Sequence, residues 1–211
     1  MVDKKPLCAL IVETRLLPNL VEIIWERHFK FLPEGTDLIV YGSSANKHII
    51  KEHFPYATFH DMGSIQMTMA NYNRFLINSI FWKSLTNYNR VLIFQHDSRI
   101  LRKGIEEFYQ WDYIGSPWTF QQHGFNGGLS LRNPAIMQHI CEKFAYDGIK
   151  NEDIHFSNIM HKFPLVYKMA PREEGLKFAV EAVFALGSLG LHAPQKWLKI
   201  SQVKELLRQY E

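Results

Sequence analysis

The sequence has few cysteines, no long apolar run and no large excess of charge of one sign. Its only cysteines, Cys8 and Cys141, each lie within an apolar pattern without metal-type spacing, so we expect buried, reduced thiols. The apolar run that ends at Glu13 is too short for a signal-peptide core or a membrane span. The sequence therefore predicts a cytoplasmic protein without a transmembrane segment, although a soluble piece of a longer membrane-bound protein would have the same pattern.

Common nucleotide-binding and hydrolytic motifs are also absent. The chain contains no GxxxxGK[ST], GxGxxG, HExxH or GxSxG pattern, so a P-loop nucleotidase, a dehydrogenase, a zinc protease and a hydrolase with a nucleophile elbow have no support. The formal net charge is only +3 and the basic residues are scattered, which indicates no obligatory nucleic-acid surface. Phosphate-bearing small molecules are compatible with this charge. No linker-like tract divides the chain, so we expect one domain over residues 1–211.

Strand and helix signals alternate in the first half of the chain. Apolar runs predict strands, and helical spacing predicts a helix opened by Pro18-Asn19 and a long helix from about Met67 to Trp82. Strands separated by helices form βαβ units with a parallel sheet, and ligands bind at the carboxyl ends of such strands. The predicted strands cover 7–12, 37–42, 57–60 and 91–94. We expect the segments that follow three of them to converge on one crevice: Glu13-Thr14-Arg15, Gly42-Ser43-Ser44 and Gln95-His96-Asp97-Ser98.

The second half follows a less regular pattern. It predicts a short strand with a turn over 111–118, a strand over 125–132 that begins with paired glycines, and a helix opened by Asn133-Pro134. Further along, we expect a helix over 154–160 with Asn151 as its cap, a loop around His192, and an amphipathic helix from Gln202.

Asp97 raises the main question, since it follows an apolar strand that looks buried. One interpretation is a turn or helix cap, because aspartate satisfies nearby backbone N–H groups. The alternative is a ligand for Mg²⁺ or Mn²⁺, which needs only one or two carboxylates when substrate phosphates fill other positions. His192 is a candidate second ligand, although most lone histidines have no such role. Lys196 follows it and offers a cation for a phosphate.

Two further segments carry residues with possible chemistry. Asn126-Gly127-Gly128 is either a bulge or a place where a ligand approaches the backbone closely. Glu152-Asp153 is either a pair of acids that complements a helix dipole or the source of a general base.

In combination, these motifs closely resemble a family described as the DUF5672 group. The resemblance implies that the chain is a glycosyltransferase. The resemblance spans roughly residues 70–197 and depends on the order and spacing of the motifs more than on any one of them. They are Tyr72-Asn73-Arg74-Phe75-Leu76 with Phe81-Trp82, Val91 to Ser98, Tyr113 to Trp118, Asn126 to Arg132, Asn151-Glu152-Asp153 and Gly190-Leu191-His192.

More distantly, the chain resembles the GT-A superfamily. This resemblance implies a Rossmann-like α/β fold with a mixed, mainly parallel sheet flanked by helices. It also implies a nucleotide-binding half over about 1–100 and a donor-sugar and acceptor half over about 101–200. The superfamily's Asp-x-Asp sequence holds a metal and a nucleotide diphosphate-sugar, whereas QHDS has a single carboxylate, so metal dependence is less firmly implied.

The resemblance implies roles for individual residues. Asp97, with His192, would hold Mn²⁺ or Mg²⁺, and Asp153 would deprotonate the acceptor hydroxyl while Glu152 positions sugar or acceptor. Donor-binding roles would fall to Thr14, Arg15, Ser43, Arg74, His96, Asp97, Asn126, Gly127, Gly128 and Lys196.

The expected activity is therefore inverting transfer of a sugar from a nucleotide diphosphate-sugar, in particular a UDP-sugar, to a carbohydrate or other hydroxyl acceptor. Two alternatives stay open, namely a nucleotide-sugar-binding protein without catalysis and a metal-dependent nucleotide-sugar hydrolase. A nucleic-acid acceptor is compatible with the slightly basic balance, but nothing in the sequence requires it.

Overall fold

The computed structural model describes residues 4–65 and 67–209, and its centre is a six-stranded sheet in the order β3-β2-β1-β4-β7-β6. The first four strands in this order are parallel, while β7 runs antiparallel to both β4 and β6. The mixed, mainly parallel sheet expected from the sequence is thus confirmed. The strands are β1 (Lys5–Glu13), β2 (Asp37–Gly42), β3 (Thr58–Asp61), β4 (Tyr88–Phe94), β6 (Tyr113–Pro117) and β7 (Phe125–Arg132).

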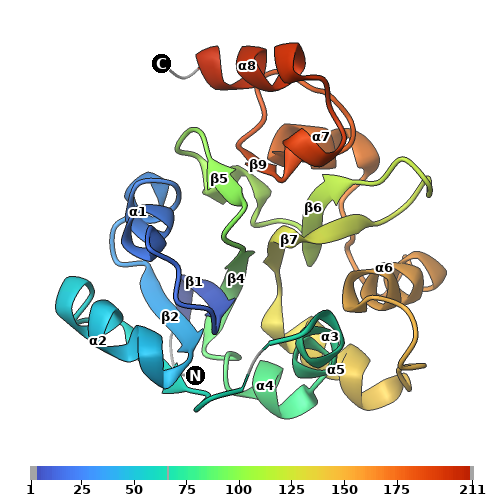
Figure 1. Cartoon of the computed structure of the whole chain (residues 1–211). Helices are drawn as coiled ribbons and strands as arrows, with labels where there is room; N and C mark the ends of the chain where they lie inside the picture. The colour runs from blue at the N-terminus through green and yellow to red at the C-terminus, as the bar shows by residue number, and fades with distance from the viewer. Residues whose placement is uncertain (1–3, 66, 210–211) are drawn as a thin grey trace.

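Helices flank this sheet, with α1 and α2 beside its N-terminal strands and α6 beside β7 (Figure 1). The helices are α1 (Leu20–Trp25), α2 (Ser44–His53), α3 (Met69–Leu76), α4 (Ser79–Lys83), α5 (Pro134–Lys143), α6 (Glu152–Lys162), α7 (Arg172–Phe178) and α8 (Ile200–Arg208). Short 3₁₀ turns are η1 (Phe29–Phe31), η2 (Ile105–Phe108) and η3 (Pro194–Lys196). In the described ranges, no helix has the length and apolar character needed to cross a membrane.

A small second sheet joins the C-terminal segment to the end of β4. Its order is β5-β9-β8, made of β5 (Ser98–Ile100), β9 (Gly190–His192) and β8 (Ala179–Val180). Antiparallel pairing sets Ser98 opposite His192. Figure 1 shows α7 and α8 gathered above β5 and β9, so residues from the end of the chain reach the strand end that carries Asp97.

The core lies on both faces of the central strands. Leu7 to Leu10 of β1 and Val91 to Phe94 of β4 are at most 1% exposed. Continuous apolar runs are expected where both faces of a parallel sheet are covered, which is why the strands were predictable from the sequence.

Several predicted elements differ from the observed ones. The long helix expected from Met67 to Trp82 is two helices, because the Oδ1 atom of Asn78 accepts the N–H of Ile80 (2.9 Å) and begins a new helix. The helix after Pro18-Asn19 ends at Trp25, which leaves Phe31 in the separate turn η1. His192 ends strand β9 and is not in a loop, because its segment pairs with β5. Helices α2 and α7 were not anticipated.

Candidate functional site

The carboxyl ends of β1, β2 and β4 lie next to one another, but the predicted convergence on one crevice holds for the segments after β1 and β4 and not for Gly42-Ser43-Ser44, which does not line the cleft described below. Asn46 donates through Nδ2 to the carbonyl oxygens of Glu13 (2.9 Å) and Arg15 (3.0 Å), and the hydroxyl of Ser43 donates to Asn46 Oδ1 (2.6 Å). The Nη2 atom of Arg15 lies 3.0 Å from Nδ1 of His96, which follows β4. Ser43 is buried, so the structure gives it a part in holding this edge together.

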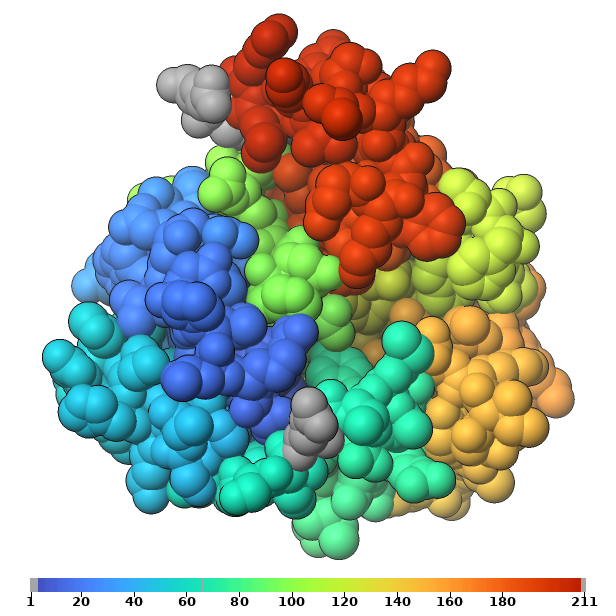
Figure 2. All heavy atoms as spheres, in the orientation of Figure 1, coloured from blue at the N-terminus to red at the C-terminus, as the bar shows by residue number. Residues whose placement is uncertain are grey.

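A cleft of about 290 Å³ opens at this edge, and Figure 2 shows the green segment after β4 exposed between the blue N-terminal part and the red C-terminal part. In its wall, Glu13 holds Arg15 through paired contacts of 2.9 Å (Nε to Oε1) and 2.6 Å (Nη2 to Oε2). Thr14 accepts the N–H of Met67 through its hydroxyl oxygen (3.0 Å), which fixes the chain before α3. The lining includes Glu13, Arg15, Thr68, Tyr72, Gln95 and His96.

Asp97 lies beside this cleft in a cluster of charged groups. Its Oδ2 accepts from Nζ of Lys196 (2.9 Å), and its Oδ1 lies 3.3 Å from Nε2 of His192. The other ring nitrogen of His192 lies 3.2 Å from Oε1 of Glu181, and Gln95 Oε1 is 3.2 Å from Nε2. The structure therefore brings Asp97, His192 and Lys196 together, and it adds Glu181, which the sequence pattern gave no reason to include.

The charges within this cluster compensate one another. Burial favours the neutral form of Asp97, but the contacts with His192 and Lys196 outweigh it and hold the pKa of Asp97 well below its usual range. Burial alone would lower the pKa of His192, yet the carboxylates of Asp97 and Glu181 raise it to about 9. Asp97 is therefore a carboxylate at neutral pH.

Asp97 and His192 are placed to hold a divalent cation, and His192 would have to release the proton that its pKa of about 9 leaves on it at neutral pH, because only the neutral ring binds a metal. Oδ1 of Asp97 is buried and has no hydrogen-bond partner among the described residues. Its 3.3 Å distance from His192 Nε2 is close to the spacing of about 3 Å between neighbouring ligands of an octahedral ion bound at about 2.1 Å. Glu181 stands where an outer carboxylate orients a ligating histidine. Within the described ranges, no group of three or more His, Cys, Asp or Glu side chains is arranged to hold a metal. Phosphate oxygens and water would have to complete the coordination.

The paired glycines at the start of β7 lie between Asp153 and His192, the partner of Asp97. A Cβ atom on Gly128 would lie 2.1 Å from Nε2 of His192, so only glycine leaves room for that ring. Its neighbour Gly127 donates its N–H to Oδ2 of Asp153 (3.0 Å). Consecutive Cα atoms are about 3.8 Å apart. The two acidic centres therefore flank one short segment.

Asp153 is buried at the start of α6. Its two oxygens accept the N–H groups of Gly127 (3.0 Å) and Ile154 (2.8 Å). Burial and the negative charge of Glu152 raise its pKa to about 7, against the lowering effect of the Gly127 hydrogen bond and of Arg132. A carboxyl group that titrates near neutral pH is suited to proton transfer.

Glu152 has a different environment from its neighbour. Both of its oxygens bind the guanidinium of Arg132, at 2.6 and 2.9 Å, and both side chains are almost completely buried. The predicted cap, Asn151, makes no capping bond through its side chain, because its Oδ1 accepts from Asn73 Nδ2 (3.2 Å). Asn73 in turn accepts the N–H of Glu152 (3.2 Å). Asn151 is thus the N-cap residue of α6, as predicted, without a side-chain capping bond.

A smaller cavity of about 180 Å³ has Asp153 in its wall. Asn126, predicted to face the donor sugar, lines it as well. Glu181 lines the same cavity, so this space borders the partner of His192 as well as Asp153. Arg74 is exposed on α3 and is not among the residues that line this cavity or the cleft.

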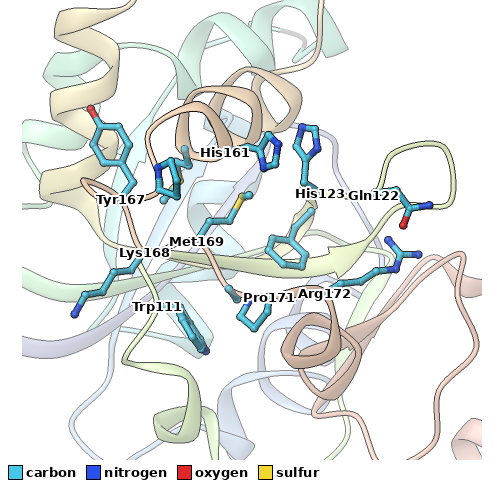
Figure 3. Close-up of a pocket in the computed structure, with 14 residues that line it drawn as sticks. Trp111, Gln122, His123, His161, Tyr167, Lys168, Met169, Pro171 and Arg172 are labelled. Atoms are coloured by element: carbon cyan, nitrogen blue, oxygen red, sulfur yellow. The ribbon is translucent and has the colours of Figure 1, made fainter.

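A larger cavity, of about 400 Å³, lies elsewhere (Figure 3). The rings of His123 and His161 stack there with centroids 3.7 Å apart, and Met169 lies beside them. None of its described lining residues is acidic. It therefore lacks the carboxylates that a cation or a general-base mechanism requires.

Comparisons with known proteins agree with this fold. A family model described as "Protein of unknown function (DUF5672)" matches residues 53–192, and no curated protein matches the chain. Among solved structures, the apo form of mouse xyloside xylosyltransferase 1 is similar, with 10% identity and a TM-score of 0.58 over 93% of this chain and 99% of that chain. The apo form of glycosyltransferase GlyE from Streptococcus pneumoniae TIGR4 has 11% identity and a TM-score of 0.53 over 98% of this chain and 60% of that chain.

A third similar structure contains ligands. The mannosyltransferase PcManGT from Pyrobaculum calidifontis, in complex with GDP-Man and Mn²⁺, has 12% identity and a TM-score of 0.50 over 79% of this chain and 55% of that chain. At such identities the likeness concerns the fold, and the GT-A-like fold expected from the sequence is confirmed.

Proposed function

The chain belongs to the DUF5672 family, and we propose that it transfers a sugar from a nucleotide diphosphate-sugar, in our assignment a UDP-sugar, to an acceptor hydroxyl. The observation that carries this proposal is the position of Gly127 and Gly128 between Asp153 and His192. Asp97, suited to bind a cation with His192, and Asp153, suited to accept a proton, therefore lie on either side of one segment. Support also comes from the shared fold of the glycosyltransferases described above.

In the proposed reaction, Asp153 accepts the proton of the acceptor hydroxyl. The acceptor oxygen then forms a bond to the anomeric carbon, and the bond from that carbon to the diphosphate oxygen breaks with its electron pair on the diphosphate. Attack from the face opposite the leaving group inverts the configuration. Glu152 would act as a positioning residue, because its contact with Arg132 fixes the first turn of α6 while its charge raises the pKa of Asp153.

Other residues of the chain would bind the donor. Lys196, which already neutralises Asp97, and Arg15 are cations near the proposed diphosphate position. Thr14, Ser43 and His96 would shape the cleft, and Asn126 would face the sugar. Arg74, on the surface of α3, would act on the diphosphate only through its charge at a distance. When bound, Mn²⁺ or Mg²⁺ at Asp97 and His192 would supply positive charge to the leaving diphosphate.

A nucleotide-sugar-binding protein without catalysis is the second candidate. The contact between Lys196 and Asp97 favours it, since a lysine already compensates the single carboxylate of the QHDS segment. A hydrolase is the third possibility, with water in place of the acceptor.

A two-stage experiment tests these functions. Thermal-shift measurements of the purified chain with nucleotides and nucleotide-sugars, each with and without Mn²⁺, should reveal the donor through a rise in Tm. Product analysis with donor alone and with added acceptors should then show transfer. Asp153→Asn should abolish transfer and retain nucleotide binding. Absence of any nucleotide-dependent shift would contradict the whole proposal, and full transfer by Asp153→Asn would refute the assignment of the base.

A further inference from the structure

The cavity beside Asp153 has aromatic walls that the proposed mechanism does not use. Phe120 is 68% exposed and Trp197 is 62% exposed, and both line this cavity. Trp118 is buried beneath Phe120, with ring centroids 5.1 Å apart and an interplanar angle of 25°. Large exposed aromatic side chains at a cavity often mark a binding surface.

Each aromatic wall is held by its own contacts. Arg172 donates to the carbonyl oxygen of Trp118 (2.7 Å), which fixes the segment before Phe120. On the opposite segment, Ala193 donates its N–H to the carbonyl oxygen of Asp97 (2.9 Å), and the Trp197 N–H bonds the carbonyl of Pro194 (3.1 Å). The rings are thus carried by anchored backbone, although the side chains themselves are solvent-exposed.

The charge of the cavity limits what it can accept. Among its described lining residues are two acids, Asp153 and Glu181, and no Lys or Arg. A phosphorylated or carboxylated acceptor would bring a negative charge toward these acids without a cation to pair it. Nucleic acid, whose affinity for proteins depends on contacts between cations and phosphates, is disfavoured for the same reason.

The polar side chains of the cavity indicate the shape of the acceptor. Thr119, Asn126 and Asn151 line the cavity together with the aromatic side chains and Asp153. A pyranose ring has an apolar face of C–H groups and a rim of hydroxyls. It can therefore stack on an aromatic side chain and at the same time form hydrogen bonds with these polar groups. The Oδ1 atoms of Asn126 and Asn151 already accept from Gly128 and Asn73, and a phenol, with one hydroxyl, would pair fewer of the remaining polar groups than a sugar does, which is costly in a recognition site.

We infer that the acceptor is a neutral pyranoside whose apolar face stacks on Trp197 or Phe120 while one hydroxyl reaches Asp153. The inference rests on the proposed transferase function and names its acceptor class. The small volume of the cavity, about 180 Å³, suits a single sugar ring within it and leaves the remainder of the acceptor at the aromatic rim.

The test compares acceptors and variants of the whole chain. With the donor identified by thermal shift, neutral methyl hexopyranosides should accept sugar, while hexose 6-phosphates and 4-methylumbelliferone should be at least tenfold poorer in kcat/KM. At least one of Trp197→Ala and Phe120→Ala should raise the acceptor KM about tenfold, and both should leave the Kd of the nucleotide unchanged. If Trp197→Ala causes the loss, Trp197→Phe should restore most of it, because a ring is retained.

Controls separate this inference from the proposed function. Leu165→Ala changes a fully exposed apolar residue that lies outside the cavity lining, so its acceptor KM should equal that of the wild type. If transfer occurs but prefers a phosphorylated or phenolic acceptor, or if both alanine variants keep the wild-type KM, the inference is wrong and the transferase function stands. If no nucleotide binds, the proposed function itself has failed and the acceptor assignment falls with it.

Discussion

The backbone N–H of Gly127 donates to Oδ2 of Asp153 over 3.0 Å, and this bond joins the start of β7 to the first turn of α6. It connects the segment next to the proposed donor sugar with the proposed base. The same bond restrains the carboxyl group, so its orientation is set before a substrate arrives. Such preorganisation reduces the cost of aligning an acceptor hydroxyl.

The stability of the protein should depend on Asp153 between about pH 4 and 7. The folded-state pKa of about 7 is above the ordinary value of 3.8, so the stability associated with its proton is present below about pH 4 and is lost as the pH rises through 7. Asp153→Asn removes this loss. As the pH rises from about 4 to 7, the free energy of unfolding of the variant in urea should increase relative to that of the wild type by up to about 1.4 kcal/mol per pH unit. Parallel pH profiles for the two proteins would contradict the raised pKa.

Loss of one partner of the Arg132–Glu152 pair should be strongly destabilising. Both side chains are buried, so Arg132→Met or Glu152→Leu leaves a charge without its partner at a cost of about 3–5 kcal/mol. The double variant Arg132→Met/Glu152→Leu should lose much less than the sum of the single losses, because no buried charge remains. Urea unfolding midpoints measure all three. Additive losses would mean that the two groups do not compensate one another.

A methyl group at residue 128 should disturb the cation site through His192. The Cβ atom would lie 2.1 Å from Nε2 of the ring, so Gly128→Ala must displace it. We expect at least a tenfold weaker Mn²⁺-dependent binding of the nucleotide, measured by calorimetry. Gly128→Ala/His192→Ala should recover stability relative to Gly128→Ala, since the clash is removed, but it should not recover binding. Wild-type affinity in Gly128→Ala would show that His192 has no part in the site.

Removal of the Asp97 carboxylate should weaken nucleotide binding in the presence of Mn²⁺. Asp97→Ala eliminates the oxygen next to His192 and the partner of Lys196, so the Mn²⁺-dependent part of the thermal shift should disappear. EDTA should have the same effect on the wild type. Asp61→Ala, a change at the exposed end of β3 outside the cleft lining, is the matched control and should retain the shift. An unchanged shift in Asp97→Ala would exclude Asp97 as a ligand.

Local patterns were sufficient for much of the framework. The strands over 37–42 and 125–132 were predicted with their observed bounds, because apolar runs next to glycine or polar residues are local signals. The break at Asn78 was missed, since the helical spacing of apolar residues continues across it. The strand position of His192 was missed because β9 is defined by pairing with β5, a segment distant in sequence.

The sequence by itself determined the α/β class, the order of the central strands along the chain, and which polar residues follow them. These properties depend on residues close together in the chain. Only the tertiary structure decided that Lys196 pairs with Asp97, that Glu181 contacts His192, and that Glu152 is occupied by Arg132 while Asp153 faces a cavity. The physical reason is that these contacts join separate elements across the fold, and the burial that raises the pKa of Asp153 exists only after those elements have packed together.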